Sequence, residues 1–383
     1  MEKHEVVIVG AGPGGLKAAQ TLMKYGKKDV VVLEALPEEK MGDKTCHGMM
    51  FPNNMAILDI PEELTETPLN GAVFYWADRT YTELNFDPPA CYMWLRKDFG
   101  RWLIEETKKL GVDIRPDSRV KQVNKEENYV ELGDNERIGY DYLIGADGAK
   151  SVVRKTLGLK TKSVMATYVE APIPPDKVPN GKSDFAHGYM AFDVVGHGWS
   201  GYTPYKDRIS FCLVSCDSKF FSNNEKIERF NAFAKEVDGI DPGEYKLRAQ
   251  AVCYKPVGLK HGNIYLVGDA GGWGDIGGGI IYSAAKTGKM AAEDICGIDI
   301  KGEFKDFNSW NRRWQLPGNI ITLYDAIVPD GIKKRTSRFL IDVVLPALAK
   351  NNLVRNFLWP YAYKLFMKVM FDPLPGDDED GKT

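Results

Sequence analysis

The N-terminal stretch constrains the fold more than any other part of the chain. A run rich in β-branched residues, 5–9, leads into a glycine-rich turn at 10–15, and a helix-like stretch follows over 16–25. A second apolar run, 30–33, ends on Glu34. Strand, glycine turn, helix, strand and acid in this order are typical of a dinucleotide-binding βαβ unit. The sequence therefore predicts such a unit at the start of the chain.

Each part of this unit has a physical role. Gly10 makes the tight turn, Gly12 leaves room for a pyrophosphate against bare backbone, and Gly15 lets the helix pack closely on the sheet. Gly14 belongs to the same turn, at the start of the helix, where free N–H groups and the helix dipole attract phosphates. Glu34 is expected to accept hydrogen bonds from the hydroxyls of an adenosine ribose.

Composition excludes several classes of protein. The 383 residues suit roughly two or three domains. A net charge of −3 gives no field that would attract nucleic acid, and no nucleic-acid-binding motif is present. None of the six cysteines lies in a CxxC pair, so no zinc or iron–sulfur site is expected. Without a targeting segment or a long apolar run, we expect a cytoplasmic protein with reduced thiols.

Two further strands of the nucleotide-binding type are predicted, one ending near 145 and one near 267. Other segments separate them from the N-terminal unit. We therefore expect an α/β fold in which one Rossmann-like domain is assembled from three segments: 1–72, 97–160 and 252–300.

The intervening segments have a different pattern. Residues 161–251 alternate apolar and polar positions and are rich in aromatics, which predicts an antiparallel sheet with one covered face. Residues 73–96 begin with a predicted β-hairpin and are assigned to the same sheet. We expect this sheet to form a substrate domain. Residues 301–383 look helical, and they end in an acidic tail at 377–380 that is expected to be disordered.

Three motifs in a fixed order carry a family resemblance. They are the N-terminal glycine motif, residues 145–148 (GADG) followed by Ser151 and Arg154, and residues 268–270 (GDA). This trio resembles the p-hydroxybenzoate hydroxylase superfamily of flavoproteins, and it implies FAD as the cofactor. Asp269 would then bind the ribityl chain, although an Asp here also suits a helix cap.

Asp147, in the second motif, is a further candidate for cofactor binding. An Asp-Gly pair is also a common turn, so both interpretations of Asp147 remain open.

Within that superfamily the chain looks most like the geranylgeranyl reductases. Residues 44–48 (KTCHG) resemble the family's cysteine loop beside the flavin, with His47 where a glycine is usual, and Arg96-x-x-Phe99 resembles its flavin contact. The resemblance implies that the following residues also lie near FAD: Cys46, His47, Met49, Arg96, Val120, Gly279 and Ile280. Val120 would lie on a strand that passes the adenine.

The family's reaction is the reduction of isolated prenyl double bonds, with a hydride from flavin N5 and a proton from elsewhere. Cys46 is the catalytic candidate. It either donates this proton or packs against the flavin as a small buried side chain. The implied substrate is a prenyl lipid or prenyl diphosphate, such as an archaeal-type ether lipid.

Four aromatic residues suit an apolar substrate tunnel: Tyr92, Trp94, Trp199 and Tyr202. They would equally suit the core of a sheet. The family's Tyr-x-Trp-x-Phe-Pro signature is altered in residues 199–204, where Gly201 replaces a tryptophan. The altered signature therefore also allows a pocket of different shape, which would bind another isoprenoid substrate.

The C-terminal segment combines apolar, aromatic and basic residues over 333–368. This pattern suits peripheral contact with the inner face of a membrane, and it also suits helices that cap a domain. The electron donor is left open between NAD(P)H and a reduced ferredoxin.

Two other functions compete with a prenyl reductase. One is a flavin monooxygenase that acts on a small aromatic, and the other is an electron carrier that reduces a quinone.

Overall fold

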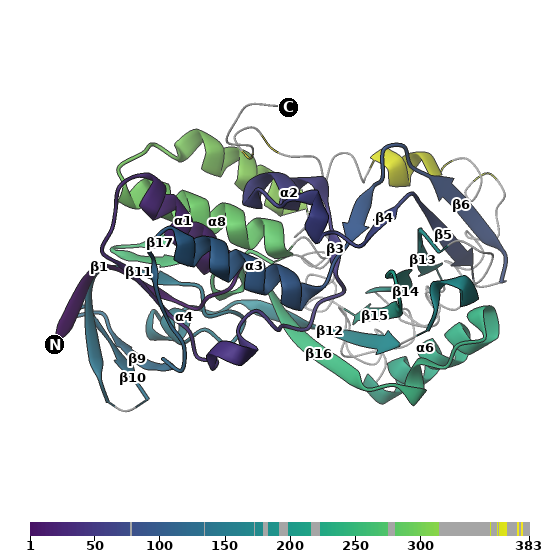
Figure 1. The fold of residues 1–383 in the computed structure, drawn as a ribbon, viewed down its shortest axis with the longest axis horizontal. Coiled ribbons are helices and arrows are strands. Elements are labelled where there is room, and N and C mark those ends of the chain that lie inside the picture. The colour runs from purple at the N-terminus through teal and green to yellow at the C-terminus, as the bar shows by residue number, and fades with distance from the viewer. Residues whose placement is uncertain are drawn as a thin grey trace, which may run out of the picture.

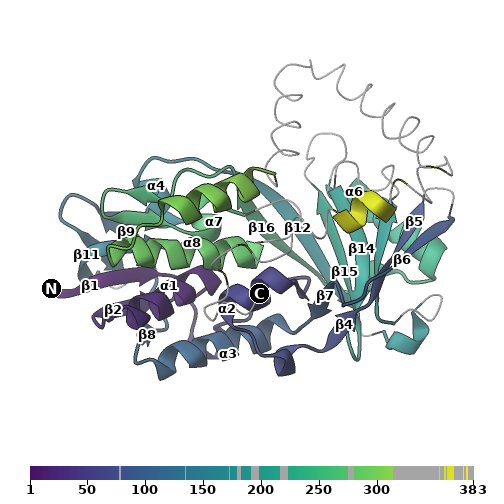
Figure 2. The ribbon, with the colours of Figure 1, turned by 90° about the horizontal axis from the view of Figure 1, so that it is seen from above.

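The computed structural model describes residues 1–76, 79–133, 135–171, 173–178, 183–190, 198–215, 223–274 and 280–313. It also describes a few later positions, among them 360–365, 374 and 377. Within these residues two large sheets form two bodies that lie side by side, and long strands run from one toward the other (Figures 1 and 2).

The first body is built on an eight-stranded sheet. Its strands are β1 (Glu2–Val9), β2 (Val30–Leu33), β8 (Asp113–Arg115), β9 (Val120–Asn124), β10 (Tyr129–Leu132), β11 (Arg137–Gly145), β17 (Lys260–His261) and β18 (Ile264–Leu266). Strands β18, β11, β1, β2 and β8 pair in parallel, and the antiparallel β9–β10 hairpin joins through β11. The sheet thus draws strands from all three predicted segments, which confirms the fold class.

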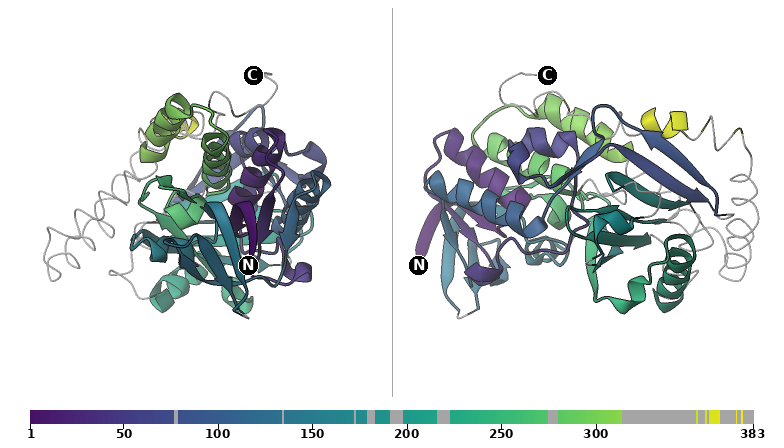
Figure 3. Two further views of the ribbon diagram at one scale, coloured as in Figure 1. Left: turned by 90° about the vertical axis from the view of Figure 1, so that its left-hand side faces the viewer. Right: turned by 45° about the vertical axis from the view of Figure 1, so that its right-hand side comes forward.

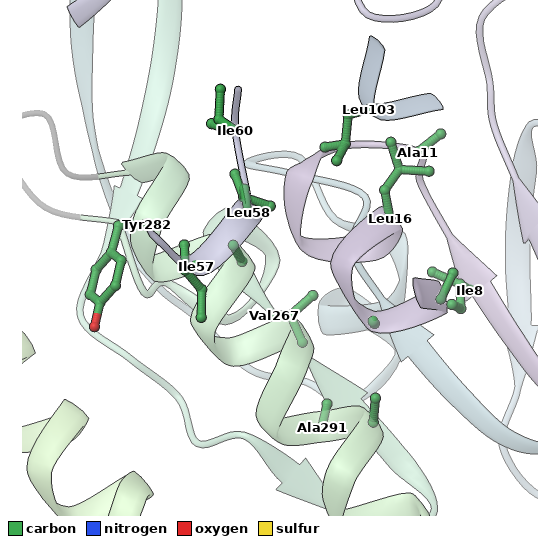
Figure 4. Close-up of a cluster of buried hydrophobic side chains, with 14 of the residues drawn as sticks. Ile8, Ala11, Leu16, Ile57, Leu58, Ile60, Leu103, Val267, Tyr282 and Ala291 are labelled. Carbon is green, nitrogen blue, oxygen red and sulfur yellow. The ribbon is translucent and has the colours of Figure 1, made fainter. Parts of the chain in front are cut away.

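Both faces of the parallel strands are covered, which explains their continuous apolar sequence. The helices of this body are α1 (Pro13–Lys24), α2 (Pro52–Leu58), α3 (Arg96–Lys109), α4 (Val152–Thr156), α7 (Gly268–Gly271) and α8 (Ile280–Ile295). Val6 and Ile8 of β1 pack in the same cluster as α1, α3 and α8, whereas Val7 and Val9 pack with the β9–β10 hairpin. Figure 4 shows the first cluster, in which Leu16 of α1 and Leu103 of α3 lie near Ile8.

The second body is built on a seven-stranded sheet, ordered β16-β12-β15-β14-β13-β5-β6. Its strands are β5 (Gly71–Trp76), β6 (Tyr81–Asn85), β12 (Lys162–Ala171), β13 (Phe185–Met190), β14 (Gly198–Pro204), β15 (Ile209–Ser215) and β16 (Leu247–Tyr254). All neighbours are antiparallel except β13 and β5, which are parallel. This pair is free of the hairpin constraint because more than a hundred residues separate the two strands in the chain.

One face of the seven-stranded sheet is covered by helix α6 (Asn223–Asp238). Phe230 and Phe233 of this helix pack against Tyr189 and Phe211 of the sheet. Figure 3 shows α6 and the β5–β6 hairpin on the same body, away from the N-terminus. Short 3-10 turns complete the described elements: η1 (Glu38–Lys40), η2 (Glu62–Leu64), η3 (Pro175–Lys177) and η5 (Pro242–Glu244).

A small third sheet takes its strands from both sides of the β5–β6 hairpin in the chain. Its strands are β3 (Met49–Met50), β4 (Thr67–Leu69) and β7 (Cys91–Met93). The sequence places residues 73–96 together in the substrate sheet, but β7 pairs with β3 and β4 instead. Cys91 and Met93 are buried in the main core with α1 and α3, and this burial outweighs pairing with the next strand in sequence.

The predicted C-terminal helices are described only in part. Residues 301–313 are helical, and Phe307 and Trp310 pack against Tyr282 of α8. Residues 314–352 and most of 353–383 lie outside the described part, including nearly all of the basic and apolar positions at 333–368. No described helix is both long enough and apolar enough to cross a membrane.

The acidic tail is not wholly disordered, contrary to the sequence-based expectation. Asp377 is buried, with its carboxylate 2.5 Å from Lys286 Nζ, and it accepts a 2.8 Å hydrogen bond from the Tyr282 hydroxyl. Lys286 is itself buried on α8 and also contacts Glu303, at 2.6 Å. An acidic composition favours disorder because an unpaired charge is costly to bury. Lys286 of α8 provides a buried cation for Asp377 and so removes part of that cost.

This ion pair predicts a stability effect. Asp377→Asn should destabilise the protein by about 3 kcal/mol, because it leaves the buried Lys286 ammonium undercompensated. Unfolding by urea, followed by tryptophan fluorescence, measures the change.

Lys3→Met is the matched control, since the Lys3–Asp141 pair is more than half exposed and should contribute little. Equal shifts of the unfolding midpoint in the two variants would contradict the expected contribution of the buried Lys286–Asp377 pair to stability.

Candidate functional site

Two adjoining hollows lie at the carboxyl ends of β1, β11 and β18, the edge at which open α/β sheets bind ligands. Cys46, Asp269 and the first turn of α8 line one of them, and Glu34 and Val120 line the other. Five residues belong to both walls: Gly12, Lys44, Arg96, Ala146 and Gly148. We call the two hollows together the channel, with a Cys46 end and a Glu34 end.

The glycine turn forms the middle of the channel, and its geometry explains the glycines. Gly10 has φ +106°, and a Cβ there would lie 2.5 Å from the Ala146 carbonyl oxygen. A Cβ on Gly15 would lie 2.1 Å from the Gly10 oxygen. At Gly12, by contrast, a Cβ would meet nothing within 4 Å. Gly12 is the N-cap of α1 and lines both hollows, so an anion would find both space and N–H donors there.

Glu34 fixes the turn from the far side of the channel. Its Oε2 accepts a 2.9 Å hydrogen bond from the Ala11 amide, and its Oε1 accepts one of 2.9 Å from the Leu36 amide. Each carboxylate oxygen can accept a second bond, so the group still has capacity for two hydroxyls. Val120 on β9 and the preceding Arg119 line the same end.

Asp147 makes local backbone contacts with one carboxylate oxygen and leaves the other without a partner among the described residues. Its Oδ2 accepts hydrogen bonds from the Val152 and Val153 amides, at 2.6 and 3.3 Å, and thereby caps α4. Its Oδ1 is buried without a hydrogen-bond partner among the described residues, although the residue lines the channel. Burial raises the pKa of this carboxyl. A buried acceptor of this kind provides a place for a donor from a bound ligand.

Asp269 lies at the Cys46 end, just past β18. Its Oδ1 accepts a 3.0 Å hydrogen bond from the Cys253 amide, which holds the carboxylate against β16. Burial raises its pKa, while the nearby positive charges of Lys44 and Arg154 act in the opposite direction. Ile280 lines the wall beside it at the start of α8, whereas Gly279 lies outside the described residues.

Arg154 holds the second and third motifs together. Its buried guanidinium donates to the carbonyl oxygens of Asp269 and Ala270, at 3.2 and 2.9 Å, and to that of Ala149, at 2.7 Å. These bonds join the loop after β11 to the turn after β18. In the sequence Arg154 stands out only as part of a motif, because no neighbouring residue indicates the distant carbonyl groups that it binds.

The loop between β2 and β3 closes the Cys46 end. Lys44, Thr45 and Cys46 line it, but His47 and Met49 line neither hollow. Arg96 does line both, and it donates a 3.0 Å hydrogen bond to the Gly42 oxygen of this loop. Burial lowers the pKa of Arg96. The loop therefore brings Cys46 into the same hollow as Asp269. The His47 side chain instead contacts the seven-stranded sheet at Thr203 and Ser210.

Two of the four predicted tunnel aromatics are core residues. Trp94 is fully buried, with its ring 4.1 Å from that of Phe99. Tyr202 is fully buried on the α6 face of the seven-stranded sheet, stacked on His187 at 4.2 Å. Alternation along β14 places its neighbour Thr203 on the opposite face, where Thr203 contacts His47 of the Cys46 loop, so the Tyr202 ring points away from that loop.

The other two aromatics are less informative. Tyr92 is half-buried on β7 and lines neither hollow, and the Trp199 side chain lies outside the described part.

Some residues of the channel wall could not be predicted from the sequence. Gln250 of β16 lines the Cys46 end; with its amide oriented to suit its neighbours, its oxygen accepts from Lys44 Nζ at 2.9 Å and its nitrogen donates to the Thr45 oxygen at 3.1 Å. Lys150 lines the Glu34 end with Arg119. Lys44 could be predicted, because it lies two residues before Cys46 in the same loop. Gln250 could not, because it comes from a strand that is distant in the sequence. Among the described residues no cluster of acidic, His or Cys side chains suits a metal.

Comparison with known proteins agrees with this geometry. Residues 3–175 match the family model described as an FAD binding domain. An uncharacterised protein of Methanosarcina barkeri is 27% identical over 320 residues, 82% of this chain and 80% of its own length. Digeranylgeranylglycerophospholipid reductase 2 of Methanococcoides burtonii is 26% identical over 329 residues, 80% of each chain.

Solved structures share the fold at lower identity. A geranylgeranyl bacteriochlorophyll reductase-like protein from Thermoplasma acidophilum is similar with a TM-score of 0.69, 18% identity and coverage of 96% of this chain and all of that one. The p-nitrophenol 4-monooxygenase of Pseudomonas putida is similar with a TM-score of 0.67, 18% identity and 98% and 100% coverage. Residues 3–175 therefore match an FAD-binding domain, which makes the protein a flavoprotein, and over about four-fifths of its length the chain is similar to a protein named as a digeranylgeranylglycerophospholipid reductase.

Proposed function

We propose that the protein is an FAD-dependent reductase that saturates isolated C=C bonds of geranylgeranyl or related prenyl chains. The observation that carries this proposal is the position of Cys46, which lines the same hollow as Asp269 and the first turn of α8. The reductase names of relatives that align over about four-fifths of the chain support it.

The channel fits FAD in an extended form. Glu34 has capacity for the ribose hydroxyls, Gly12 and the start of α1 offer space and donors to the pyrophosphate, and Asp147 Oδ1 is a spare acceptor between them. Asp269, Ile280 and Cys46 would then surround the ring system. Val120 and Arg96 complete the proposed set, and His47 and Met49 would support it from outside the walls.

FAD, when bound and reduced, supplies a hydride to one alkene carbon. The chain must deliver a proton to the other carbon and keep water away from the site. Cys46 is the thiol in the wall and is the proposed donor. An alkene offers no polar handle, so positioning must contribute much of the catalysis.

The two electrons must come from outside the chain. NAD(P)H and a reduced ferredoxin both remain candidates for the donor.

We further propose that residues 360–365 contact a membrane surface that holds the prenyl lipid. In this helical turn Tyr363 packs on Phe74 of β5, with ring centroids 4.7 Å apart. Tyr361 and Leu365 expose 72% and 51% of their surfaces, beside Lys364. An anchored turn with exposed apolar groups and a basic neighbour suits an interfacial contact.

Product analysis tests the reductase. FAD-loaded protein, reduced by dithionite without oxygen, should convert a geranylgeranyl phospholipid into products heavier by two hydrogens for each double bond, as read by mass spectrometry. Cys46→Ala should bind FAD normally but reduce the lipid about a hundredfold more slowly, because the proton donor is lost.

Cys296→Ala is the matched control, as this partly exposed cysteine lies at the end of α8 away from the channel. Unchanged lipid, together with phenol hydroxylation once oxygen is admitted or with flavin reoxidation by quinone alone, would replace the reductase with one of the two competing functions.

A cofactor titration tests the Glu34 end. Glu34→Ala should weaken FAD binding at least about tenfold, because charge-assisted bonds to the ribose are lost along with the support of the Ala11 amide. Quenching of flavin fluorescence measures the dissociation constant. Glu39→Ala, on the nearby η1 turn, removes an exposed carboxylate and should change nothing. Equal affinities of all three proteins would place the cofactor elsewhere.

Vesicle binding tests the membrane contact. Replacing Tyr361 and Leu365 together by Ser should abolish co-sedimentation with vesicles that contain anionic phospholipid. Leu110→Ser removes a comparably exposed leucine from the other body and should bind as the parent does. Sedimentation that is the same in all three proteins would rule out this surface.

A further inference from the structure

His47, the residue that follows Cys46, is inserted into the seven-stranded sheet. Its side chain is buried, with Nε2 3.0 Å from Thr203 Oγ1 on β14 and Nδ1 3.3 Å from Ser210 Oγ on β15. Thr203 and Ser210 are directly paired across the two strands, so the imidazole spans one cross-strand pair. Both hydroxyls are fully buried.

The ring suits these partners in its neutral form. A neutral imidazole has one donor and one acceptor nitrogen, and each hydroxyl can take either role, so both contacts are satisfied in either tautomer. Burial lowers the pKa of His47 to about 3, so the ring carries no charge near neutral pH. A hydrophobic side chain of similar size would leave two buried hydroxyls facing an apolar surface.

The backbone around His47 is held as well. The Tyr205 hydroxyl donates to the His47 oxygen at 2.8 Å, and the Trp94 amide donates to the Gly48 oxygen at 3.0 Å. Gly48 has φ +81°, and a Cβ there would overlap the Tyr205 hydroxyl. The Gly48 amide approaches Cys46 Sγ, at 3.5 Å. Fixing the two residues after Cys46 therefore fixes the direction of its thiol.

We propose that His47 is a positioning residue: by anchoring the Cys46 loop to β14 and β15, it sets the Cys46 thiol in the wall of the flavin hollow. The anchor joins the loop that lines the Cys46 end of the channel to the seven-stranded sheet. This inference rests on the proposed function for the purpose of Cys46, but not for the contacts of His47.

Thiol labelling tests the anchor without any substrate. FAD-loaded protein is treated with iodoacetamide, and the labelling rate of Cys46 is read by peptide mass spectrometry. His47→Ala should label about tenfold faster than the parent, because the loop loses its two side-chain hydrogen bonds and opens more often. The visible absorption band of the bound flavin should shift in the same variant.

Two further variants separate positioning from a general loss of stability. His47→Gln, whose amide offers a donor and an acceptor, should restore slow labelling. His187→Ala removes a histidine buried on the opposite face of the same sheet, so it should lower the melting temperature without changing Cys46 labelling. If His47→Ala does not fold, His47→Asn takes its place, because its shorter amide cannot span both hydroxyls.

Parental Cys46 labelling and an unshifted flavin band in the folded variant would overturn the proposal. Faster labelling of the His47→Ala variant, combined with a parent protein that reduces no prenyl substrate, would instead keep the anchor and reject the reductase.

Discussion

The structure depends on a direct backbone contact between helices α1 and α8. A Cβ on Gly288 would lie 2.1 Å from the Gly14 oxygen, and a Cβ on Gly14 would lie 2.9 Å from the Ala284 oxygen. With glycine at both positions the helices cross without intervening side chains, and the first turns of both line the Cys46 end of the channel. Any larger residue at the crossing would separate the helices and displace the wall that each provides.

The remaining walls follow from how three distant segments meet. Parallel pairing brings the loops after β1, β11 and β18 to one edge, and the buried Arg154 guanidinium joins the second loop to the third. The cysteine loop closes this edge from the side of the seven-stranded sheet, where His47 fixes it to Thr203 and Ser210. The channel is therefore a product of tertiary contacts that no single motif contains.

The sequence predicts the nucleotide-binding half well because its signals are local. The N-terminal stretch contains apolar runs that are buried on both faces, glycines that close approach requires, and an acid just after β2. Three of the predicted site residues do line the channel: Glu34, Cys46 and Asp269. The alternatives that the sequence leaves open concern long-range contacts. Alternation shows that Tyr202 and Thr203 face opposite ways, but not which face α6 covers.

Other long-range contacts escaped prediction for the same reason. Composition favours a disordered tail, yet Asp377 forms an ion pair with the buried Lys286 of α8.

A crystal structure of the FAD-loaded protein tests most directly whether the channel binds FAD. We expect the adenosine hydroxyls on Glu34, the pyrophosphate at Gly12, and the ring system between Asp269 and Cys46. A ring system at the Glu34 end, or another side chain between it and Cys46, would contradict the account.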